Sequence, residues 1–319
     1  MTLPVTMPRV EPRAADTSRI EIRAAVMSIA VGCGLMAIKF VAYFITGSAA
    51  IFSDAFESIV NVLASGFAFY SLRLAHRPAD REHPYGHGKI EFMSAGFEGG
   101  LILIAALVIA VKTLDTLLFH QIQVEDLGLG LALVALAMLV NGAVGLYLIG
   151  IGRKHRSMTL EADGKHLLSD AVTSVAALAA LLIIKLTGWI YADPIAALLI
   201  AVYIASLGVG LLRRSAAGLM DEQDMDDTRL LEGILDAHAG PSGSEPRICS
   251  YHKLRHRHAG RYHWVDFHLV IPAEMRIEQG HDIASRIEFE IEQSLGDADA
   301  TAHVEPCTDT GCAACRPAR

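Results

Sequence analysis

The stretch Ser53-Asp-Ala-Phe-Glu-Ser-Ile-Val-Asn-Val-Leu-Ala-Ser65 lies inside a hydrophobic segment that is long enough to cross a bilayer. On a helix that turns by about 100° per residue, Asp54, Glu57 and Asn61 fall within about 60° of one another and form one polar face. Ionisable groups at membrane depth are costly unless they line a cavity or meet a partner. This face therefore indicates a functional site.

A second segment repeats the spacing. Asp163, His166 and Asp170 again stand three and four residues apart, at the start of another long apolar run. Two polar helix faces that offer oxygen and imidazole donors suggest one metal site between two transmembrane helices.

Composition separates the chain into two parts with different solvents. The 319 residues are 52% hydrophobic and 19% charged, which is typical of a membrane protein with a soluble part. Residues 221–319 contain 19 acidic and 10 basic side chains, a net charge of −9, so the overall −8 leaves about +1 for residues 1–220. Nucleic acid is excluded as a partner of so acidic a domain.

Six apolar runs predict six transmembrane helices, because each is near or above the roughly 20 residues that a spanning helix needs. They cover residues 24–46, 49–75, 90–118, 127–151, 161–187 and 190–213. We expect residues 1–19, rich in Pro, Arg and Thr, to be disordered and not a cleavable signal peptide.

The loops between these runs predict the orientation. Basic residues gather before the first run and after the second, fourth and sixth, whereas the other three loops contain essentially none. Cytoplasmic loops carry the excess of Lys and Arg, so both termini and the acidic domain should lie in the cytoplasm.

After Met220 the pattern becomes that of a soluble α+β domain of about 85 residues. Val265, Phe267 and Leu269 should face one side of a strand, and Asp266 and His268 the other. The expected elements, in the order αββαβ, are a helix at 221–239, strands at 248–257 and 262–271, a helix at 277–295 and a short strand at 301–304.

Three motifs together resemble the cation diffusion facilitator family, whose bacterial members export ferrous iron and zinc. They are Ser48–Ser65, the segment His83-Pro-Tyr-Gly-His-Gly-Lys-Ile-Glu91, and His166-Leu-Leu-Ser-Asp170, followed by the α+β tail. The resemblance covers residues from about 19 to 306. It implies a homodimer in the bacterial inner membrane, with a metallochaperone-like (ferredoxin-like) cytosolic domain. The chain should then consist of a disordered segment at 1–19, a six-helix transmembrane domain at 20–214, a cytosolic dimerisation and metal-binding domain at 221–306 and a Cys-containing tail at 307–319.

The resemblance also implies a transport site with two ligands from each of two helices. The matching positions are Glu57 and Asn61, with His166 and Asp170. Family members commonly have His or Asp at the first position and Asp at the second, so Asn61 removes one negative charge. Asp54 and Asp163 lie one turn away; each either replaces the missing carboxylate or caps a helix.

Two further sites follow from the resemblance. Asp80, His83 and His87 match a loop site; the alternative is that Gly86 and Gly88 shape a turn and the histidines cap the third helix. The matches to a binuclear zinc site at the dimer interface are His252, His268, His281, His303 and Glu305. The alternative there is a polar, pH-sensitive surface. Lys89 and Asp221 match an inter-domain ion pair.

The last residues contain Cys307, Cys312 and Cys315. A Cys-x2-Cys pair with a third Cys nearby either captures Zn²⁺ or Cu(I) or forms a flexible thiol tail.

These observations predict proton-coupled efflux of divalent transition metals. Zn²⁺ is favoured, with Fe²⁺, Co²⁺, Mn²⁺, Cd²⁺ and Ni²⁺ as other candidates, and no cofactor beyond bound metal is expected. A non-transporting metal sensor or partner subunit is the alternative, because Asn61 cannot carry charge. An enzyme is not expected, since the polar helices contain no His-Glu-x-x-His.

Overall fold

The computed structural model describes residues 13–46, 49–119, 128–189, 191–241, 243–309 and 312. Within these ranges the side chains of 13–17, 42, 45–46, 49–57, 116, 119, 128–131, 133–134, 177, 180–181, 185 and 193 are not described. The chain divides into two compact units. We call residues 10–216 the helical unit, and residues 217–319, with which residues 1–9 are grouped, the sheet unit.

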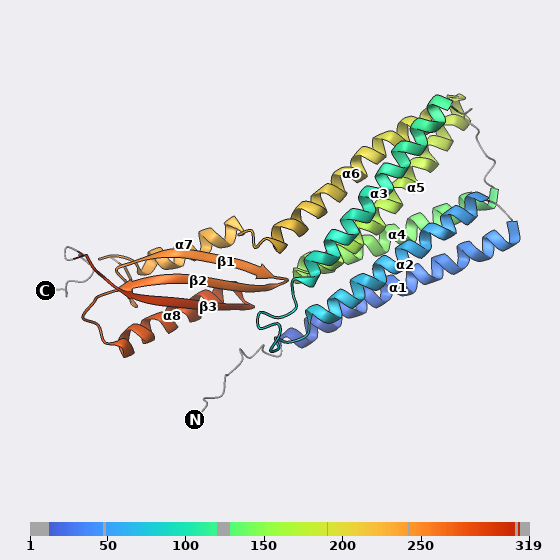
Figure 1. The fold of residues 1–319 in the computed structure, drawn as a ribbon. Helices are drawn as coiled ribbons and strands as arrows, with labels where there is room; N and C mark the ends of the chain where they lie inside the picture. The colour runs from blue at the N-terminus through green and yellow to red at the C-terminus, as the bar shows by residue number, and fades with distance from the viewer. Residues whose placement is uncertain are drawn as a thin grey trace. The chain divides into compact units, whose positions relative to one another are not determined.

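The described part of the helical unit consists of long helices that run side by side (Figure 1). Their bounds are α1 Arg13–Thr46, α2 Ala49–Ala75, α3 Ile90–Phe119, α4 Gly128–His155, α5 Met158–Thr187 and α6 Ala192–Leu219. The six apolar runs of the sequence therefore correspond to these helices.

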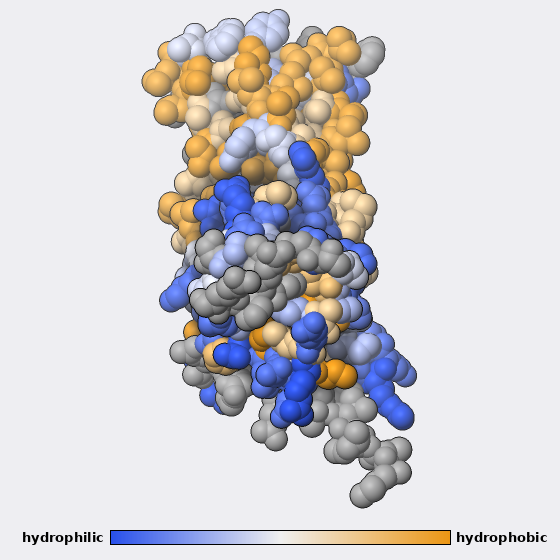
Figure 2. All heavy atoms as spheres, turned by 90° about the vertical axis from the view of Figure 1, so that its left-hand side faces the viewer, coloured by the Kyte–Doolittle hydropathy of each residue, from blue (hydrophilic) through white to orange (hydrophobic). Residues whose placement is uncertain are grey.

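Hydrophobic side chains dominate the visible surface of the helical unit, whereas hydrophilic residues are common on the sheet unit (Figure 2). Val202 is 71% exposed and Leu199 68% exposed, which suits contact with lipid acyl chains. Among the described residues, five helices are long and apolar enough to span a bilayer, namely α1, α2, α3, α4 and α6. Helix α5 is long enough, but its first half carries five ionisable side chains: Glu161, Asp163, Lys165, His166 and Asp170.

Two close crossings between helices depend on glycine. A Cβ atom placed on Gly164 of α5 would lie 2.7 Å from the carbonyl oxygen of Gly145 on α4. A Cβ atom on Gly208 of α6 would lie 2.9 Å from the carbonyl oxygen of Gly99 on α3. Small residues let helix backbones touch inside membranes, so these crossings hold α4 against α5 and α3 against α6.

The start of α1 corrects one expectation. Residues 13–19 were expected to be disordered, but the helix begins at Arg13. The sequence Arg13-Ala-Ala-Asp-Thr-Ser-Arg19 contains two Ala and two Arg residues, which are good helix formers, and it is continuous with the apolar run that follows. Residues 1–12 lie outside the described part of the chain.

The sheet unit contains two helices and a three-stranded sheet with the order β1-β2-β3. Its elements are α7 Met225–His238, β1 Ser250–Ala259, β2 Tyr262–Ile271, α8 Ile277–Leu295 and β3 Ala298–Pro306. Strand β2 pairs antiparallel with β1 and parallel with β3. This order confirms the expected αββαβ domain. Helix α7 begins four residues later than expected, because Asp224 caps it by accepting a hydrogen bond from the N–H of Asp226 at 2.8 Å.

The core of the sheet unit lies between one face of the sheet and the two helices. Val265, Phe267 and Leu269 are buried on this face of β2, while Asp266 is exposed, as the alternation predicts. They pack with residues that recur at helical spacing on α7 and α8: Leu231, Leu235, Ile283, Ile287 and Ile291. Each fully buried Leu, Ile or Phe contributes about 1.5–3 kcal/mol. The opposite face of the sheet is not covered by α7 or α8.

Candidate metal centre

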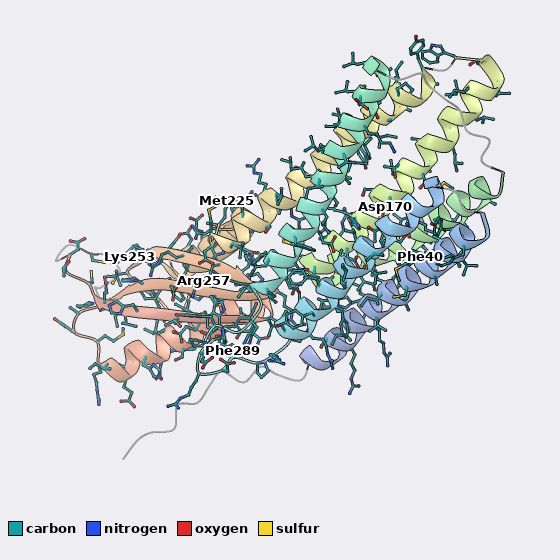
Figure 3. The ribbon with its side chains drawn as sticks, turned by 45° about the vertical axis from the view of Figure 1, so that its right-hand side comes forward. Phe40, Asp170, Met225, Lys253, Arg257 and Phe289 are labelled. Atoms are coloured by element: carbon teal, nitrogen blue, oxygen red, sulfur yellow. The ribbon has the colours of Figure 1, made fainter. Side chains whose placement is uncertain are left out.

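Helices α2 and α5 bring three polar side chains together inside the helical unit. Nδ2 of Asn61 donates a hydrogen bond to Oδ2 of Asp170 at 2.8 Å. Nε2 of His166 lies 3.0 Å from Oδ1 of Asn61 and donates to it, because a carbonyl oxygen only accepts. His166 is buried, and Figure 3 shows Asp170 among the helices. The i, i+4 spacing on α5 thus directs both side chains toward α2.

A carboxylate that the spacing of α2 and α5 did not predict lies beside this group. Glu98 of α3 is fully buried, and Oε2 is 3.9 Å from Nδ1 of His166. Neither oxygen of Glu98 makes a hydrogen bond to a described residue. The sequence signal for it was a carboxylate within the apolar run 90–118, which by itself indicates a functional position.

Asp163 has a different environment from its neighbours on α5. It is fully buried and accepts hydrogen bonds from Ser28 Oγ at 2.8 Å and Ser65 Oγ at 2.9 Å. These contacts join α5 to α1 and α2. They fit a structural role for Asp163 better than a role as a metal ligand.

Glu57 and Asp54 occupy the turns of α2 that precede Asn61, but their side chains lie outside the described part of the structure. Their expected roles stay predictions.

A second polar layer lies where α1, α3 and α5 begin and where α2 and α6 end. His76 Nε2 is 2.8 Å from Glu21 Oε2, and Ser157 Oγ donates to Glu91 Oε2 at 2.7 Å. Nearby on α5, Glu161 pairs with Arg214 at 2.9 Å. Sequence reasoning did not identify these pairs, because their partners come from helices far apart in the chain.

The loop between α2 and α3 gathers its three expected residues. Asp80 lies 3.1 Å from His83 Nδ1 and 3.4 Å from His87 Nε2, and the two imidazole rings are 4.4 Å apart between centroids. The backbone N–H of His83 donates to Oδ1 of Asp80 at 2.7 Å and lowers the pKa of that carboxyl group. An ionised carboxylate beside two imidazoles forms an incomplete shell for a divalent cation.

On the open face of the sheet, four of the five expected residues lie together. Glu305 of β3 is 2.7 Å from His268 Nδ1, 3.2 Å from His252 Nε2 and 3.8 Å from His303 Nε2. The hydrogen bond from His268 lowers the pKa of Glu305. The donor atoms of His252, His268 and Glu305 all lie within 4.8 Å of one another, so this set fits the zinc that the resemblance implied.

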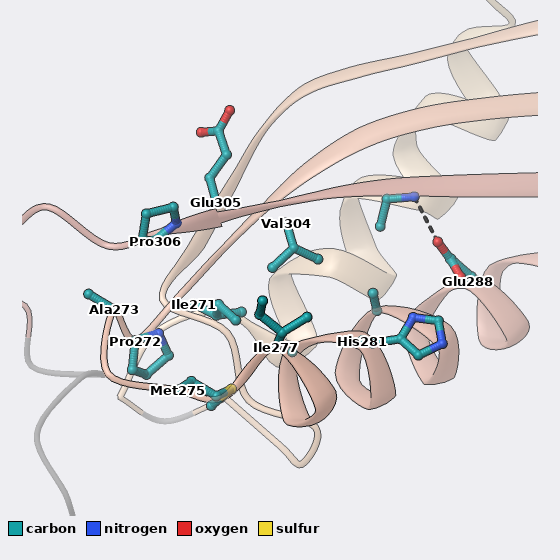
Figure 4. Close-up of a pocket in the computed structure, with 13 residues that line it drawn as sticks. Ile271, Pro272, Ala273, Met275, Ile277, His281, Glu288, Val304, Glu305 and Pro306 are labelled. Carbon is teal, nitrogen blue, oxygen red and sulfur yellow. Dashed lines mark hydrogen bonds between the residues drawn. The ribbon is translucent and has the colours of Figure 1, made fainter.

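The fifth residue, His281, is not part of that group within one chain. It lies on α8 beside a pocket of about 400 Å³ that α8, β3 and the end of β2 enclose. Figure 4 shows Glu305 pointing away from this pocket, on the far side of β3.

The cysteines meet in a combination that the sequence did not predict. Cys249, Cys307 and Cys312 place their sulfur atoms within 4.8 Å of one another. Cys249 N–H donates to Val270 O and Cys307 N–H to Ile271 O, so both thiols flank the end of β2. Cys315 lies outside the described residues. Lys89 and Asp221 belong to different units, and their pairing stays a prediction.

Comparison with known proteins covers nearly the whole chain. Residues 25–220 match the model of the cation efflux transmembrane domain, and residues 242–307 match that of the cation efflux protein cytoplasmic domain. The chain belongs to the cation diffusion facilitator family.

Its relatives extend over most of its length. An uncharacterised transporter, sll1263, from Synechocystis is 36% identical over 92% of this chain and 93% of its own. The cation-efflux pump FieF of Shewanella oneidensis is 30% identical over 88% of this chain and 92% of its own. FieF of Salmonella typhimurium is 29% identical over 91% of this chain and 94% of its own. A solved structure of CzrB aligns with 26% of this chain and 96% of its own at 25% identity, with a TM-score of 0.24 that is too low to interpret.

Membership gives the coarse function. This cation diffusion facilitator is a multi-pass membrane transporter of divalent cations, and its family is one of efflux proteins and not of enzymes.

Proposed function

We propose that this chain exports divalent transition-metal cations from the cytoplasm in exchange for protons, with Zn²⁺ as the substrate that its donors fit best. The observation that carries the proposal is the convergence of Asn61, His166 and Asp170 from α2 and α5. One imidazole, one carboxylate and one amide oxygen suit a borderline cation, and the absence of a thiolate among these three disfavours Cu(I). Fe²⁺, Co²⁺, Mn²⁺, Cd²⁺ and Ni²⁺ are the other candidates.

The hydrogen bonds of this centre support the exchange of cations for protons. Nε2 of His166 donates to Asn61, so this nitrogen must give up its proton, to Nδ1 or to solvent, before it can bind a cation. Carboxylates and imidazoles bind metal in their unprotonated forms, so protons compete with the cation for Asp170 and His166. Metal binding then releases protons, and protonation releases metal. Alternation of the site between the two sides of the membrane would couple efflux to the inward proton gradient.

Two further carboxylates support a binding pocket larger than three residues. Glu98 lies next to His166, and Glu57 is one turn before Asn61 on the same helical face. We assign Glu57 as the fourth ligand and Glu98 as a supporting carboxyl group beside His166.

The proposed arrangement in the cell follows from the basic loops and from the cytosolic domain. Both termini face the cytoplasm of a bacterial cell, in the inner membrane, and two copies of the chain form a homodimer. The uncovered face of the sheet, with Glu305 and its histidines, supports a dimer contact to which the second copy contributes His281.

The test is metal-driven proton flux in vesicles that contain the purified protein and internal dyes for Zn²⁺ and for pH. Wild-type protein should exchange Zn²⁺ for protons. His166→Ala and Asp170→Asn should reduce both fluxes at least tenfold, and Glu98→Gln should reduce them less. Ser206→Ala is the matched control, because Ser206 is an exposed residue of α6.

Two results would contradict the proposal. Full flux in His166→Ala and Asp170→Asn would exclude this centre as the transport site. Metal binding by wild-type protein without any flux would favour the alternative function, a non-transporting metal sensor.

A further inference from the structure

The sheet unit contains a second histidine cluster, which the transport function does not use. Its members are Asp227 in the first turn of α7, His258 near the end of β1 and His263 near the start of β2. Their donor atoms lie within 4.8 Å of one another.

This cluster lies on the opposite face of the sheet from Glu305 and its histidines. His263 and His268 are five residues apart on β2, so they point to opposite faces. His263 shares the face of Val265 and Phe267, which α7 and α8 cover, and it is 1% exposed.

A β-bulge lets β1 supply histidines to both faces. His252 pairs with His268 and His258 pairs with His263, although His252 and His258 are an even number of residues apart. The register shifts between His252 and Arg255, where Lys253 has a φ of 52°. The extra residue of the bulge reverses the alternation, so His258 turns toward α7.

The distances within the cluster fit a shared cation better than hydrogen bonds. Oδ2 of Asp227 is 3.3 Å from His258 Nε2 and 3.4 Å from His263 Nδ1. Hydrogen bonds between such atoms are usually about 2.7–2.9 Å long. Ligand bonds of about 2.0–2.1 Å in a tetrahedron place neighbouring donors about 3.3–3.4 Å apart.

The burial of the donors also fits a site that is almost closed. The side chains of Asp227 and His258 are 18% and 24% exposed, and His258 Nε2 is buried without a hydrogen bond to any described residue. Three protein donors leave a fourth position on the exposed side for water. His256, on the same face of β1, is engaged elsewhere through a contact of 2.8 Å between Nε2 and Thr228 Oγ1.

The first turn of helix α7 has no buried apolar side chain that would hold it against the sheet. Its buried apolar residues, Leu231 and Leu235, lie beyond its first turn, whereas Met225 in the first turn is exposed. Thr228 Oγ1 in the first turn lies 2.8 Å from His256 Nε2, and Gln223 Oε1, just before the helix, accepts a hydrogen bond from His256 N–H at 3.2 Å.

We propose that Asp227, His258 and His263 bind one divalent cation of the zinc class, and that this ion fastens the first turn of α7 to the β1–β2 hairpin. The site is independent of the transport centre and of the cluster around Glu305.

The test uses the full-length protein, purified in detergent, stripped with a chelator and titrated with Zn²⁺. Asp227→Asn keeps the size of the side chain but removes its charge, and His258→Gln removes one imidazole. Each substitution should lower the zinc stoichiometry by about one ion per chain. His256→Gln, a neighbour that is not a ligand, should leave it unchanged.

Hydrogen exchange provides a second readout that separates metal binding from misfolding. Zn²⁺ should slow exchange of the amides of residues 225–229 in wild-type protein and in His256→Gln, and should have no such effect in Asp227→Asn. All variants should keep the slow exchange of the β2 core. Unchanged stoichiometry in Asp227→Asn and His258→Gln, or an equal loss in His256→Gln, would overturn the proposal.

Discussion

At the scale of single residues, Asn61 makes two hydrogen bonds, one as donor and one as acceptor, and a carboxylate at this position could only accept. Its amide donates to Asp170 and accepts from His166, so it is compatible with a metal-free centre in which Asp170 is ionised. An aspartate there would face Asp170 without a hydrogen to share unless a cation or a proton lay between them.

The Asn61→Asp variant should therefore bind cations more tightly, and its transport rate should depend more steeply on pH. We expect the KM for Zn²⁺ to fall about tenfold, which corresponds to about 1.4 kcal/mol, together with a stronger loss of transport at acidic pH. Transport by vesicles at several pH values measures both. Asn61→Ala is the control, and an equal KM in Asn61→Ala and Asn61→Asp would refute a role for charge.

Glu292 in α8 makes the stability of the sheet unit depend on pH. Burial raises its pKa, and Asp299 and Glu288 add repulsion, although the N–H of Ala300 donates to Oε1 at 3.1 Å. A carboxyl group with a raised folded-state pKa favours folding below its unfolded pKa and loses that contribution as the pH rises through the folded value.

Glu292→Gln should therefore stabilise the sheet unit at neutral pH and have little effect below about pH 4, where the unfolded group is protonated as well. The gain should stay under about 1 kcal/mol, because solvent screens this half-buried group. Hydrogen exchange of β3 amides measures it, with the exposed Glu274→Gln as control. A loss of stability at neutral pH would show that the sign is wrong.

At the scale of elements, α5 depends on α4 through glycine. A methyl group on Gly164 would meet Gly145 O at 2.7 Å and Ile149 N at 2.8 Å, both of them backbone atoms that cannot move aside alone. The ligand positions His166 and Asp170 follow directly on the same helix.

Gly164→Ala should separate α4 from α5, destabilise the helical unit by about 1–3 kcal/mol and reduce transport severalfold more than it reduces the amount of protein in the membrane. Gly150→Ala is the matched control on α4, since a methyl group there would meet nothing within 4 Å. Thermal unfolding in detergent and vesicle flux measure the two effects. Equal behaviour of the two variants would contradict the proposed crossing.

Much of the fold could be predicted from residue patterns within single helices and strands. Six apolar runs, the alternation of β2 and the spacing of Ile283, Ile287 and Ile291 each depend on neighbours in one element, so the sequence alone reveals them. The repeated spacing also predicted that the polar faces of Asn61 and His166 meet, and the resemblance to a family added which positions on these faces are the expected ligands.

Other features depend on pairings that no single element contains. Glu98 faces His166 only because α3 packs on α5, and Cys249 meets Cys307 because β1 and β3 both flank β2. The cluster of Asp227, His258 and His263 needs a bulge at Lys253, and nothing in the local sequence distinguishes that bulge from a regular strand.

At the scale of the whole molecule, the proposed orientation can be tested with the cysteines of the sheet unit. Cys307 and Cys312 should lie in the cytoplasm and are partly exposed. A membrane-impermeant maleimide should therefore label them only after intact cells are permeabilised. A cysteine that replaces His120, in the loop between α3 and α4, should be labelled from outside. Labelling of the C-terminal thiols in intact cells would contradict the proposed cytoplasmic location of the sheet unit.

The glycine crossings also determine which parts of the transporter can shift. Where α4 touches α5, and α3 touches α6, the glycines let backbone meet backbone. We therefore expect the two helices of each pair to move together during the transport cycle. Helix α2 meets α5 through the hydrogen bonds of Asn61 and of Ser65, and water or the cargo can replace those of Asn61. If the proposed transport site is correct, the contact between α2 and α5 is where the helices are expected to separate, because the cation would replace the hydrogen bonds of Asn61 there.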